Sequence, residues 1–310
     1  MFTTPAITGN IDKIVFREIP ESSNALALLQ SGDIDIAYDL AGDQRQKIGA
    51  ISGFRIDKTP GNFLQWLQFP FATTTNPQLL DLNVRQAIVN AIPYKDILDR
   101  AYLGYATQMI CALAPIYPGY DVVSKAVGAK VQDLNKAKDF LSKSQYASGF
   151  DTTIHYDASI AEQEQIGVLI KAALAEIGIN VTLIKQQDSD FVAQAFGSTG
   201  FPGMCLFMDM VGLPSPAFTT FLYFLKGHCC SPGGYQDTDI NNLYAQQIAS
   251  IGDVNKQIQL QAQIEDIAWN KDPTGAPLAY PGFQLSLQNK VSGWWWMSLD
   301  ELLYQKAIKA

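Results

Sequence analysis

Several residue classes are scarce in this chain of 310 residues, and each scarcity excludes a class of protein. The two histidines lie far apart and the four cysteines lack a CxxC spacing, so no structural zinc site is predicted, while one disulfide is left open. With 22 basic against 30 acidic residues, the net charge is −8, and no Lys/Arg cluster favours nucleic acid. Uninterrupted apolar runs fall short of the ~18 residues of a membrane span.

The first ten residues, MFTTPAITGN, have neither a basic region nor an apolar stretch of the kind that a secretory leader needs. A signal peptide is therefore not predicted in this chain. From these residues alone, we expect either a cytosolic start or the beginning of a fragment.

Enzyme motifs are also missing. The sequence contains no GxSxG and no phosphate-binding loop, and its one suggestive pair is His228 beside Cys229. Adjacent side chains rarely point at each other, whereas a nucleophile needs its base within hydrogen-bond reach and a group that orients that base. We therefore predict a protein that is not an enzyme and needs no metal or cofactor.

The most regular pattern lies in the middle of the chain, from Ala161 to Asp209. Apolar residues recur at helical spacing through AEQEQIGVLIKAALAEIG, Gly178 ends that helix, and INVTLI follows as a buried strand. A short amphipathic helix (190–196) then leads to the apolar run MCLFM, which ends on Asp209. This alternation predicts an α/β lobe with a largely parallel sheet, whose binding groups lie just beyond the strand ends.

The rest of the chain continues the α/β pattern. Residues 11–19 alternate like a strand, and ESSNALALLQSG reads as a helix with Ser22 or Ser23 as its N-cap and Gly32 as its stop. Further strands are predicted in DIDIAYDL, in NFLQWLQF, at 152–156 and in APLAYPGFQLSL, which Pro281 and Gly282 break. The remaining predicted helices cover 44–51, 83–92, 94–103, 135–144, 239–251 and 254–270. A short aromatic helix between two loops is also predicted within VGLPSPAFTTFLYFLKGHCCSPGGYQD.

Several stretches, in this order, resemble the extracytoplasmic solute-binding proteins of peptide and nickel ABC transporters, family 5. The matching segments are IDKIVFREIPESSNALALLQSGDIDIA, LNVRQAIVNAIPYKDIL, LIKAALAEIGINVTLIKQQDSDF, GGYQDTDINNLYAQQIAS and the closing VSGW. Each segment is loose by itself, but five in the right order over nearly the whole chain make a specific signal.

The resemblance implies an α/β fold of the type II periplasmic-binding-protein kind, with two lobes joined by a two-strand hinge near 66–69 and 278–281. Residues 1–66 with 282–310 would form part of lobe I, and residues 67–281 would form lobe II. The first lobe is expected to be incomplete, because relatives carry a longer N-terminal part with a signal peptide. The implied function is that of an ABC importer's solute-binding component, which captures a peptide or similar small solute in an interlobe cleft by hinge closure.

The implied partners are a peptide-like or cationic small solute and an ABC permease in the membrane, at a periplasmic or extracytoplasmic location. The alternative is a truncated, transport-inactive fragment that serves only as a self-associating or partner-dependent structural domain. An exposed apolar patch where absent strands would pack is expected to distinguish this alternative.

Asp209 is the leading candidate for ligand binding. In peptide-binding relatives an acidic residue at this place pairs with the α-ammonium of the ligand, and a carboxylate in an apolar cleft is a strong partner for a cation. A helix cap or a surface turn is the competing interpretation. Relatives follow this residue with a short turn, whereas MVGLPSPAF is longer here.

Five further residues complete the predicted ligand-binding set. Asn62 and Phe63, in PGNFLQW, resemble the hinge-side strand of dipeptide-binding relatives, and Tyr280 could present its ring and hydroxyl to the cleft. Phe207 and Tyr235 are candidate wall residues, although packing in the core is the better explanation for each of them.

Oligopeptide-binding relatives place basic side chains where this sequence aligns Ala195 and Gly203. A peptide held by its free carboxylate is therefore not supported by the resemblance. A cationic or a neutral solute fits as well, and the sequence does not name the solute.

Overall fold

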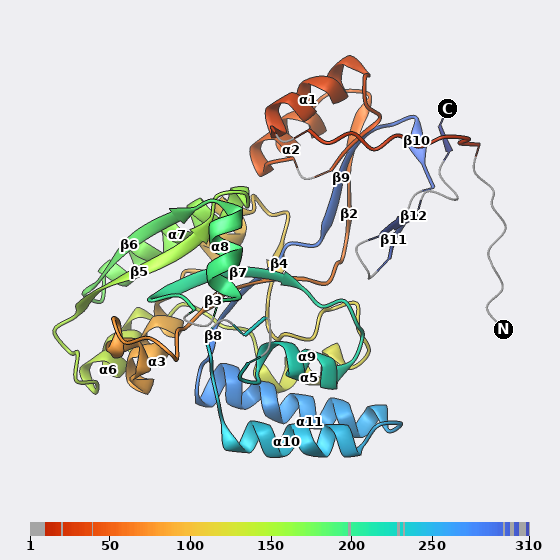
Figure 1. The fold of residues 1–310 in the computed structure, drawn as a ribbon. Coiled ribbons are helices and arrows are strands. Elements are labelled where there is room, and N and C mark those ends of the chain that lie inside the picture. The colour runs from red at the N-terminus through yellow and green to blue at the C-terminus, as the bar shows by residue number, and fades with distance from the viewer. Residues whose placement is uncertain are drawn as a thin grey trace. The chain divides into compact units, whose positions relative to one another are not determined.

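The computed structural model describes residues 10–19, 21–38, 40–197, 200–227, 230–231, 233–293, 295–297, 301–303 and 308–309. The chain divides into two compact units, labelled by their elements in Figure 1. Unit 1 combines Met1–Gly61 with Gly282–Ala310, and unit 2 is the uninterrupted stretch Asn62–Pro281. Unit 2 is thus inserted between the two parts of unit 1.

Unit 1 contains a small antiparallel sheet with two helices. Strand β9 (Phe283–Gln288) lies between β1 (Ile36–Tyr38) and β2 (Phe54–Thr59), and pairs with both. Helices α1 (Ser22–Ser31) and α2 (Gly42–Gly49) supply Leu29 and Ile48 to its core. Short strands form two further pairs, β10 (Val291–Ser292) with β13 (Ile308–Lys309) and β11 (Trp295–Met297) with β12 (Glu301–Leu303).

Two local predictions for unit 1 are wrong. The described residues 10–19 contain no strand, and Val15 and Phe16 are 73% and 79% exposed, because no described strand lies beside them to complete a ladder. The N-cap of α1 is Glu21 rather than Ser22 or Ser23, since Ser22 already lies in the helix and its hydroxyl donates a hydrogen bond to Gln44. The predicted stop at Gly32 is confirmed, with φ of +87°.

Unit 2 is built around a six-stranded mixed sheet in the order β4-β8-β3-β7-β5-β6. Strands β5, β6 and β7 are parallel, as the central alternation predicted, whereas β3 runs antiparallel to β7 and β8, and β4 runs antiparallel to β8. The bounds are β3 (Phe63–Gln68), β4 (Thr107–Gln108), β5 (Phe150–Asp157), β6 (Ile179–Gln186), β7 (Met204–Met210) and β8 (Gly275–Tyr280).

Helices cover both faces of this sheet, as Figure 1 shows, and each face has its own hydrophobic core. One core receives α3 (Leu82–Ala91), α4 (Tyr94–Asp96) with η2 (Ile97–Ala101), α6 (Leu134–Ser142) and α7 (Ala161–Ala175), next to η1 (Pro77–Leu80). The other receives α5 (Tyr120–Val127), α8 (Asp188–Ala195), α9 (Pro216–Tyr223), α10 (Thr238–Ala249) and α11 (Val254–Asp266) with η3 (Ile267–Lys271). The sequence did not predict α5.

The turn between α7 and β6 follows directly from the sequence. Gly178 has φ of +85°, and a Cβ at the neighbouring Gly149 would lie 2.0 Å from the carbonyl oxygen of Gly178. Only glycines permit this approach of the chain before β5 to the chain before β6. It sets the register in which the two strands start together, Phe150 opposite Ile179.

The break predicted at Pro281 and Gly282 is confirmed, since β8 ends at Tyr280 and β9 begins at Phe283. Gly282 has φ of +69°, and a Cβ there would lie 3.0 Å from the carbonyl oxygen of Thr59. The chain passes from unit 2 back into unit 1 at this break.

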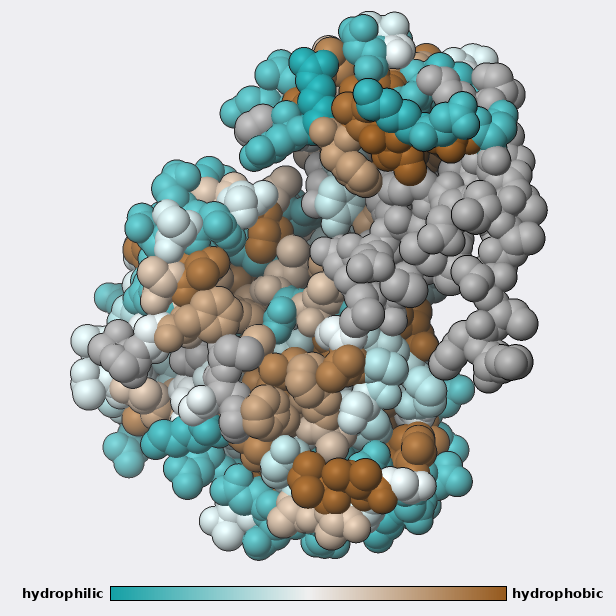
Figure 2. Space-filling view, turned by 45° about the vertical axis from the view of Figure 1, so that its right-hand side comes forward, coloured by the Kyte–Doolittle hydropathy of each residue, from teal (hydrophilic) through white to brown (hydrophobic). Residues whose placement is uncertain are grey.

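Hydrophobic side chains also reach the surface, and Figure 2 shows several brown areas among the hydrophilic ones on one face. The exposed ones include Ile248, Ile251 and Val254, where α10 ends and α11 begins. In the described part of the chain, no helix is both long and apolar enough to cross a membrane.

Candidate functional site

Strand pairing brings four of the predicted residues to one end of the strands β3 and β7, in the sheet of unit 2. Asp209 is the penultimate residue of β7 and pairs with Leu64 of β3, while Phe63 pairs with Met210. The amide of Val211 donates a hydrogen bond of 3.2 Å to the carbonyl of Asn62. The end of β7 therefore gathers four predicted residues, Asn62, Phe63, Phe207 and Asp209. This is the carboxyl end of the parallel strands, where such sheets present binding groups.

The Asp209 carboxylate is half-buried and is held by neutral donors. The Met210 N–H donates to Oδ1 at 2.7 Å and the Tyr223 hydroxyl donates to Oδ2 at 3.2 Å. Burial raises the pKa of Asp209, and the hydrogen bonds from Cys230, Met210 and Tyr223 only partly offset this effect. No lysine or arginine in the described residues forms an ion pair with Asp209.

The Phe207 ring belongs to the core beneath this edge. It is 4% exposed, and its centroid lies 5.0 Å from that of Trp66, which in turn packs edge-on against Tyr223 at 5.3 Å. The aromatic rings therefore hold β7, β3 and α9 together below the carboxylate. This packing places apolar aromatic rings next to the Asp209 carboxylate.

Asn62 and Phe63 differ in their surroundings. The Asn62 side chain is fully buried, and its Nδ2 donates to the carbonyl of Val211 at 2.7 Å and to the Tyr117 hydroxyl at 3.2 Å. These bonds fasten the start of β3 to the residue that follows β7. Phe63 is only half-buried, so part of its ring reaches the surface of unit 2.

Tyr280 lies at the end of β8, on the far side of β3 from β7. Its hydroxyl donates to the carbonyl of Cys111 at 2.7 Å and accepts from the N–H groups of Cys111 and Ile110 at 3.1 and 3.3 Å. The Tyr280 side chain is 4% exposed, so its hydroxyl is buried in unit 2 and is engaged in these hydrogen bonds.

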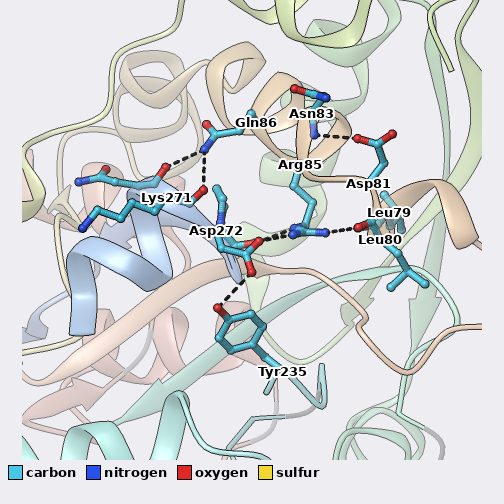
Figure 3. A network of polar contacts seen from close by, with 11 residues as sticks. Leu79, Leu80, Asp81, Asn83, Arg85, Gln86, Tyr235, Lys271 and Asp272 are labelled. Carbon is cyan, nitrogen blue, oxygen red and sulfur yellow. Dashed lines mark hydrogen bonds and ion pairs between the residues drawn. The ribbon is translucent and has the colours of Figure 1, made fainter. Parts of the chain in front are cut away.

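Tyr235 lies in a different polar network, which Figure 3 shows. Its hydroxyl donates to Oδ2 of Asp272 at 3.2 Å, and Asp272 also forms an ion pair with the buried Arg85. The Arg85 guanidinium donates in addition to the carbonyls of Leu79, Leu80 and Pro273. Through Asp272 and Arg85, Tyr235 is therefore linked to the ends of η1 and η3 from its place in the chain before α10.

A surface cavity of about 1010 Å³ lies elsewhere in unit 2 and contains none of the predicted residues. Gln86, Asn90, Lys130 and Asn270 contribute its polar lining. Burial lowers the pKa of Lys130 to about 8, with repulsion from Lys136 adding to the effect. Among the described residues, no group of three His, Cys, Asp or Glu side chains is arranged to hold a metal ion.

Among the described residues, Cys111, Cys205 and Cys230 are buried and none of them is in a disulfide. His228 and Cys229, the pair weighed as catalytic, lie outside the described residues.

Residues 6–226 match the family described as bacterial extracellular solute-binding proteins, family 5 Middle. The chain belongs to this family. The family 5 chain is 20% identical over 306 residues to the glutathione-binding protein GsiB of Salmonella paratyphi A, an alignment that covers 93% of this chain and 56% of the relative. The chain therefore spans about half the length of this curated relative.

Solved structures share the type II periplasmic binding fold of this family 5 chain. The periplasmic binding protein DppA of Helicobacter pylori, in complex with the peptide STSA, has a TM-score of 0.78 at 23% identity, over 94% of this chain and 56% of its own. NikA of Staphylococcus aureus, in complex with Ni(L-His)2, has a TM-score of 0.76 at 16% identity, over 91% and 58%. The predicted family and fold class are thus confirmed.

The sequence did not point to the neighbours of Asp209 in this family 5 chain. Tyr223 sits in the apolar run FLYFL and Cys230 follows a loop, so neither belongs to a recognisable motif. Tyr223 lies 14 residues after Asp209 and reaches it because α9 packs against Trp66 of β3.

We expect the stability of the ligand-free family 5 chain to depend on pH through Asp209. Its folded-state pKa lies above the unfolded value, so the free energy of unfolding falls as the pH rises through the folded-state pKa. Asp209→Asn lacks this decrease, so its melting temperature relative to that of the native chain should rise as the pH increases. Melting curves of both proteins from about pH 4 to about pH 7 test this, and parallel pH dependences would contradict it.

Proposed function

We propose that this chain is the solute-binding component of an ABC importer, and that it binds a peptide-like or cationic small solute beside Asp209. Family membership supports solute binding as the general role. The three relatives reported above are named for, or bound to, glutathione, a peptide and a nickel–histidine complex, and this range leaves the identity of the solute open.

The observation that carries the proposal is the state of the Asp209 carboxylate. Folding leaves a half-buried carboxylate at a strand end, with neutral donors and no ion pair from the described residues. Such a carboxylate lowers its free energy by pairing with a cation, because the low local dielectric strengthens a charge-assisted hydrogen bond. A cationic group on the solute is the partner that this environment favours.

The chain crosses between the two units twice, and these two crossings support a hinge as part of the proposal. One lies at Gly61–Asn62 and the other at Pro281–Gly282. Gly61 and Gly282 approach closely, since a Cβ at Gly61 would lie 3.4 Å from the carbonyl carbon of Gly282. Hinge residues absorb φ/ψ changes, and glycines do so at little cost. Closure about this hinge would bury the solute, and an ABC permease in the membrane would receive it.

The experiment is a thermal-shift screen with a pool of tetrapeptides that carry free N-termini and no Lys or Arg. We expect the pool to raise the melting temperature of the native chain, because a ligand that binds only the folded state stabilises it by mass action. Asp209→Asn should weaken binding by roughly tenfold to a hundredfold, the effect of losing a charge-assisted bond.

Asp157→Asn is the matched control for this screen. Asp157 ends the neighbouring parallel strand β5, and its Oδ1 accepts the N–H of Ser159 at 2.8 Å, a bond that an asparagine oxygen can also accept. This variant removes one negative charge from the same edge of the sheet and should keep the shift. If Asp209→Asn responds to the pool like the native chain, the proposed site is wrong.

The alternative of a structural domain without transport function has weaker support. Its main observation is the exposed run Ile14–Phe16 in unit 1. Exposed apolar side chains are common on folded proteins, so this short run does not outweigh the family match.

A further inference from the structure

The surface cavity of about 1010 Å³ in unit 2 contains none of the residues proposed above to bind the solute. Its volume lies at the upper end of the range of about 300–1,000 Å³ that small-molecule sites occupy. Helix α3, the segment 127–133, the start of α6 and the end of η3 line it. The Asp133 N–H donates to the carbonyl of Asn90 at 2.8 Å and Asn270 Nδ2 donates to that of Val127 at 3.0 Å, so these pieces are fixed to one another.

Three amide side chains of the lining donate hydrogen bonds but accept none from described residues. Gln86 Nε2 donates to the carbonyl of Asn270 at 2.6 Å, and Asn90 Nδ2 donates to that of Gln86 at 2.7 Å. Gln132 Nε2 donates to the carbonyl of Ala91 at 2.9 Å. Within the described part of the chain, no donor is bonded to the side-chain oxygens of Gln86, Asn90 and Gln132. The cavity therefore offers three acceptors to which hydroxyl groups of a ligand can donate.

Lys130 brings a half-buried ammonium to the same cavity. Its Nζ donates to Oδ1 of Asn270, the one hydrogen bond that this amine makes within the described residues, so two of its three N–H groups remain available. Burial lowers the pKa of Lys130 to about 8, which leaves most of the amine protonated at neutral pH. Binding an anion stabilises such a partly desolvated ammonium, because a charge-assisted bond is strong where water is scarce.

The carboxylates near this amine are engaged elsewhere. Asp133, which contributes the one carboxylate among the described residues of the lining, caps α6 by accepting the N–H of Lys136 at 2.9 Å. Asp266 forms an ion pair with Lys271 at 2.8 Å. The Lys136 side chain also lines the cavity, and its positive charge repels that of Lys130. The lining thus has an excess of positive charge that an anionic ligand would offset.

We propose that this cavity is a further small-molecule site, which binds a hydroxylated carboxylate with its carboxylate on Lys130 and its hydroxyl groups on the three amide oxygens. An apolar carboxylate would leave those oxygens without donors, and a cationic ligand would be repelled by the two lysines. A phosphate dianion would bring its charge close to the same oxygens, which accept but do not donate. The site shares no residue with that around Asp209, so the failure of either proposal leaves the other standing.

The test uses three six-carbon probes on the full chain at neutral pH. D-Gluconate carries a carboxylate and hydroxyl groups, sorbitol carries hydroxyl groups alone, and hexanoate carries a carboxylate alone. Ligand-observed NMR titrations give the apparent Kd of each probe. We expect gluconate to bind at least about tenfold more tightly than sorbitol or hexanoate, because each of those lacks one class of hydrogen bond.

Lys130→Met removes the amine and keeps a side chain of similar length. It should weaken gluconate binding by at least about tenfold, to the level of sorbitol, since it deletes the charge-assisted bond. Lys171→Met is the matched control: Lys171 is an exposed lysine of α7 outside the cavity lining, and its removal should leave the Kd unchanged. Gln132→Met removes one acceptor and should weaken gluconate about threefold to tenfold while hexanoate binds as before.

A labelling experiment on the native chain locates the site without any substitution. Acetic anhydride acetylates accessible amines, and peptide mass spectrometry follows each lysine. Gluconate at about ten times its Kd should slow the acetylation of Lys130 about tenfold and leave that of Lys171 unchanged. Equal rates at Lys130 with and without gluconate would overturn the proposal. So would gluconate binding no more tightly than either other probe, or binding to Lys130→Met as to the native chain.

Discussion

Glu265→Ala should lower the free energy of unfolding by more than about 3 kcal/mol, because it leaves several buried donors without a partner. Glu265 lies on α11 with no exposed surface. Its carboxylate accepts from the backbone N–H of Ala112, from that of Leu113 at 3.2 Å, and from Gln261 Nε2 and Trp269 Nε1, both at 2.9 Å. One side chain thus satisfies the loop before α5 and two residues of its own helical stretch.

Urea unfolding of the purified variant measures this loss. Glu265→Gln keeps the shape but replaces one acceptor oxygen with an NH2 group that faces other donors, so it should also destabilise the protein, by a smaller amount. The exposed Glu176→Ala is the matched control and should change stability by no more than ~0.5 kcal/mol. A loss at Glu265→Ala as small as the control's would contradict the assignment of this carboxylate as a structural centre.

Arg85→Met should cost about 3 kcal/mol, because it removes one partner of a largely buried ion pair. The Arg85 side chain is 5% exposed, and three backbone carbonyls besides Asp272 depend on its guanidinium (Figure 3). It also lies over the Phe71 ring, 4.8 Å from the centroid. The Asp272 side chain is 34% exposed, so water can partly solvate it and the loss falls at the lower end of the range for buried pairs.

Two further variants separate the contribution of the Arg85 guanidinium from that of the other groups in its network. Tyr235→Phe removes only the hydrogen bond to Asp272 and should cost about 1 kcal/mol. Adding Asp272→Asn to Arg85→Met removes the uncompensated charge and should restore part of the stability that Arg85→Met loses. If urea unfolding shows Arg85→Met to be no less stable than Tyr235→Phe, the guanidinium network contributes far less than its geometry indicates.

The sequence predicted best those features that depend on neighbouring residues. Helical spacing through Ala161–Ala175 and the following strand follow from local preferences, and the structure confirms them. The helix is capped by Glu176 rather than by the predicted Gly178, which takes its positive φ in the turn that follows. The position of Asp209 near the end of β7 follows in the same way. Local pattern alone misled at residues 11–19, because alternation indicates a strand only where another strand is available to pair with it.

The immediate partners of the site could not be predicted, for a related reason. Tyr223 contacts Asp209 only because α9 packs over Trp66, and Glu265 meets Ala112 across 153 positions of sequence. Neither contact leaves a periodic or compositional signal. The same residues in the same helices would look identical in sequence if those helices packed elsewhere.

The middle position of β9 in the sheet of unit 1 has a consequence for the order of events during synthesis. Within the part of unit 1 that the structure describes, strands β1 and β2 have no ladder with each other and each pairs with β9 alone, a strand that is translated after the whole of unit 2. On the ribosome, Asn62–Pro281 can therefore emerge and fold as a unit before β9, the strand that pairs with β1 and β2, has been made. Unit 1 is completed last, although most of its residues are made first.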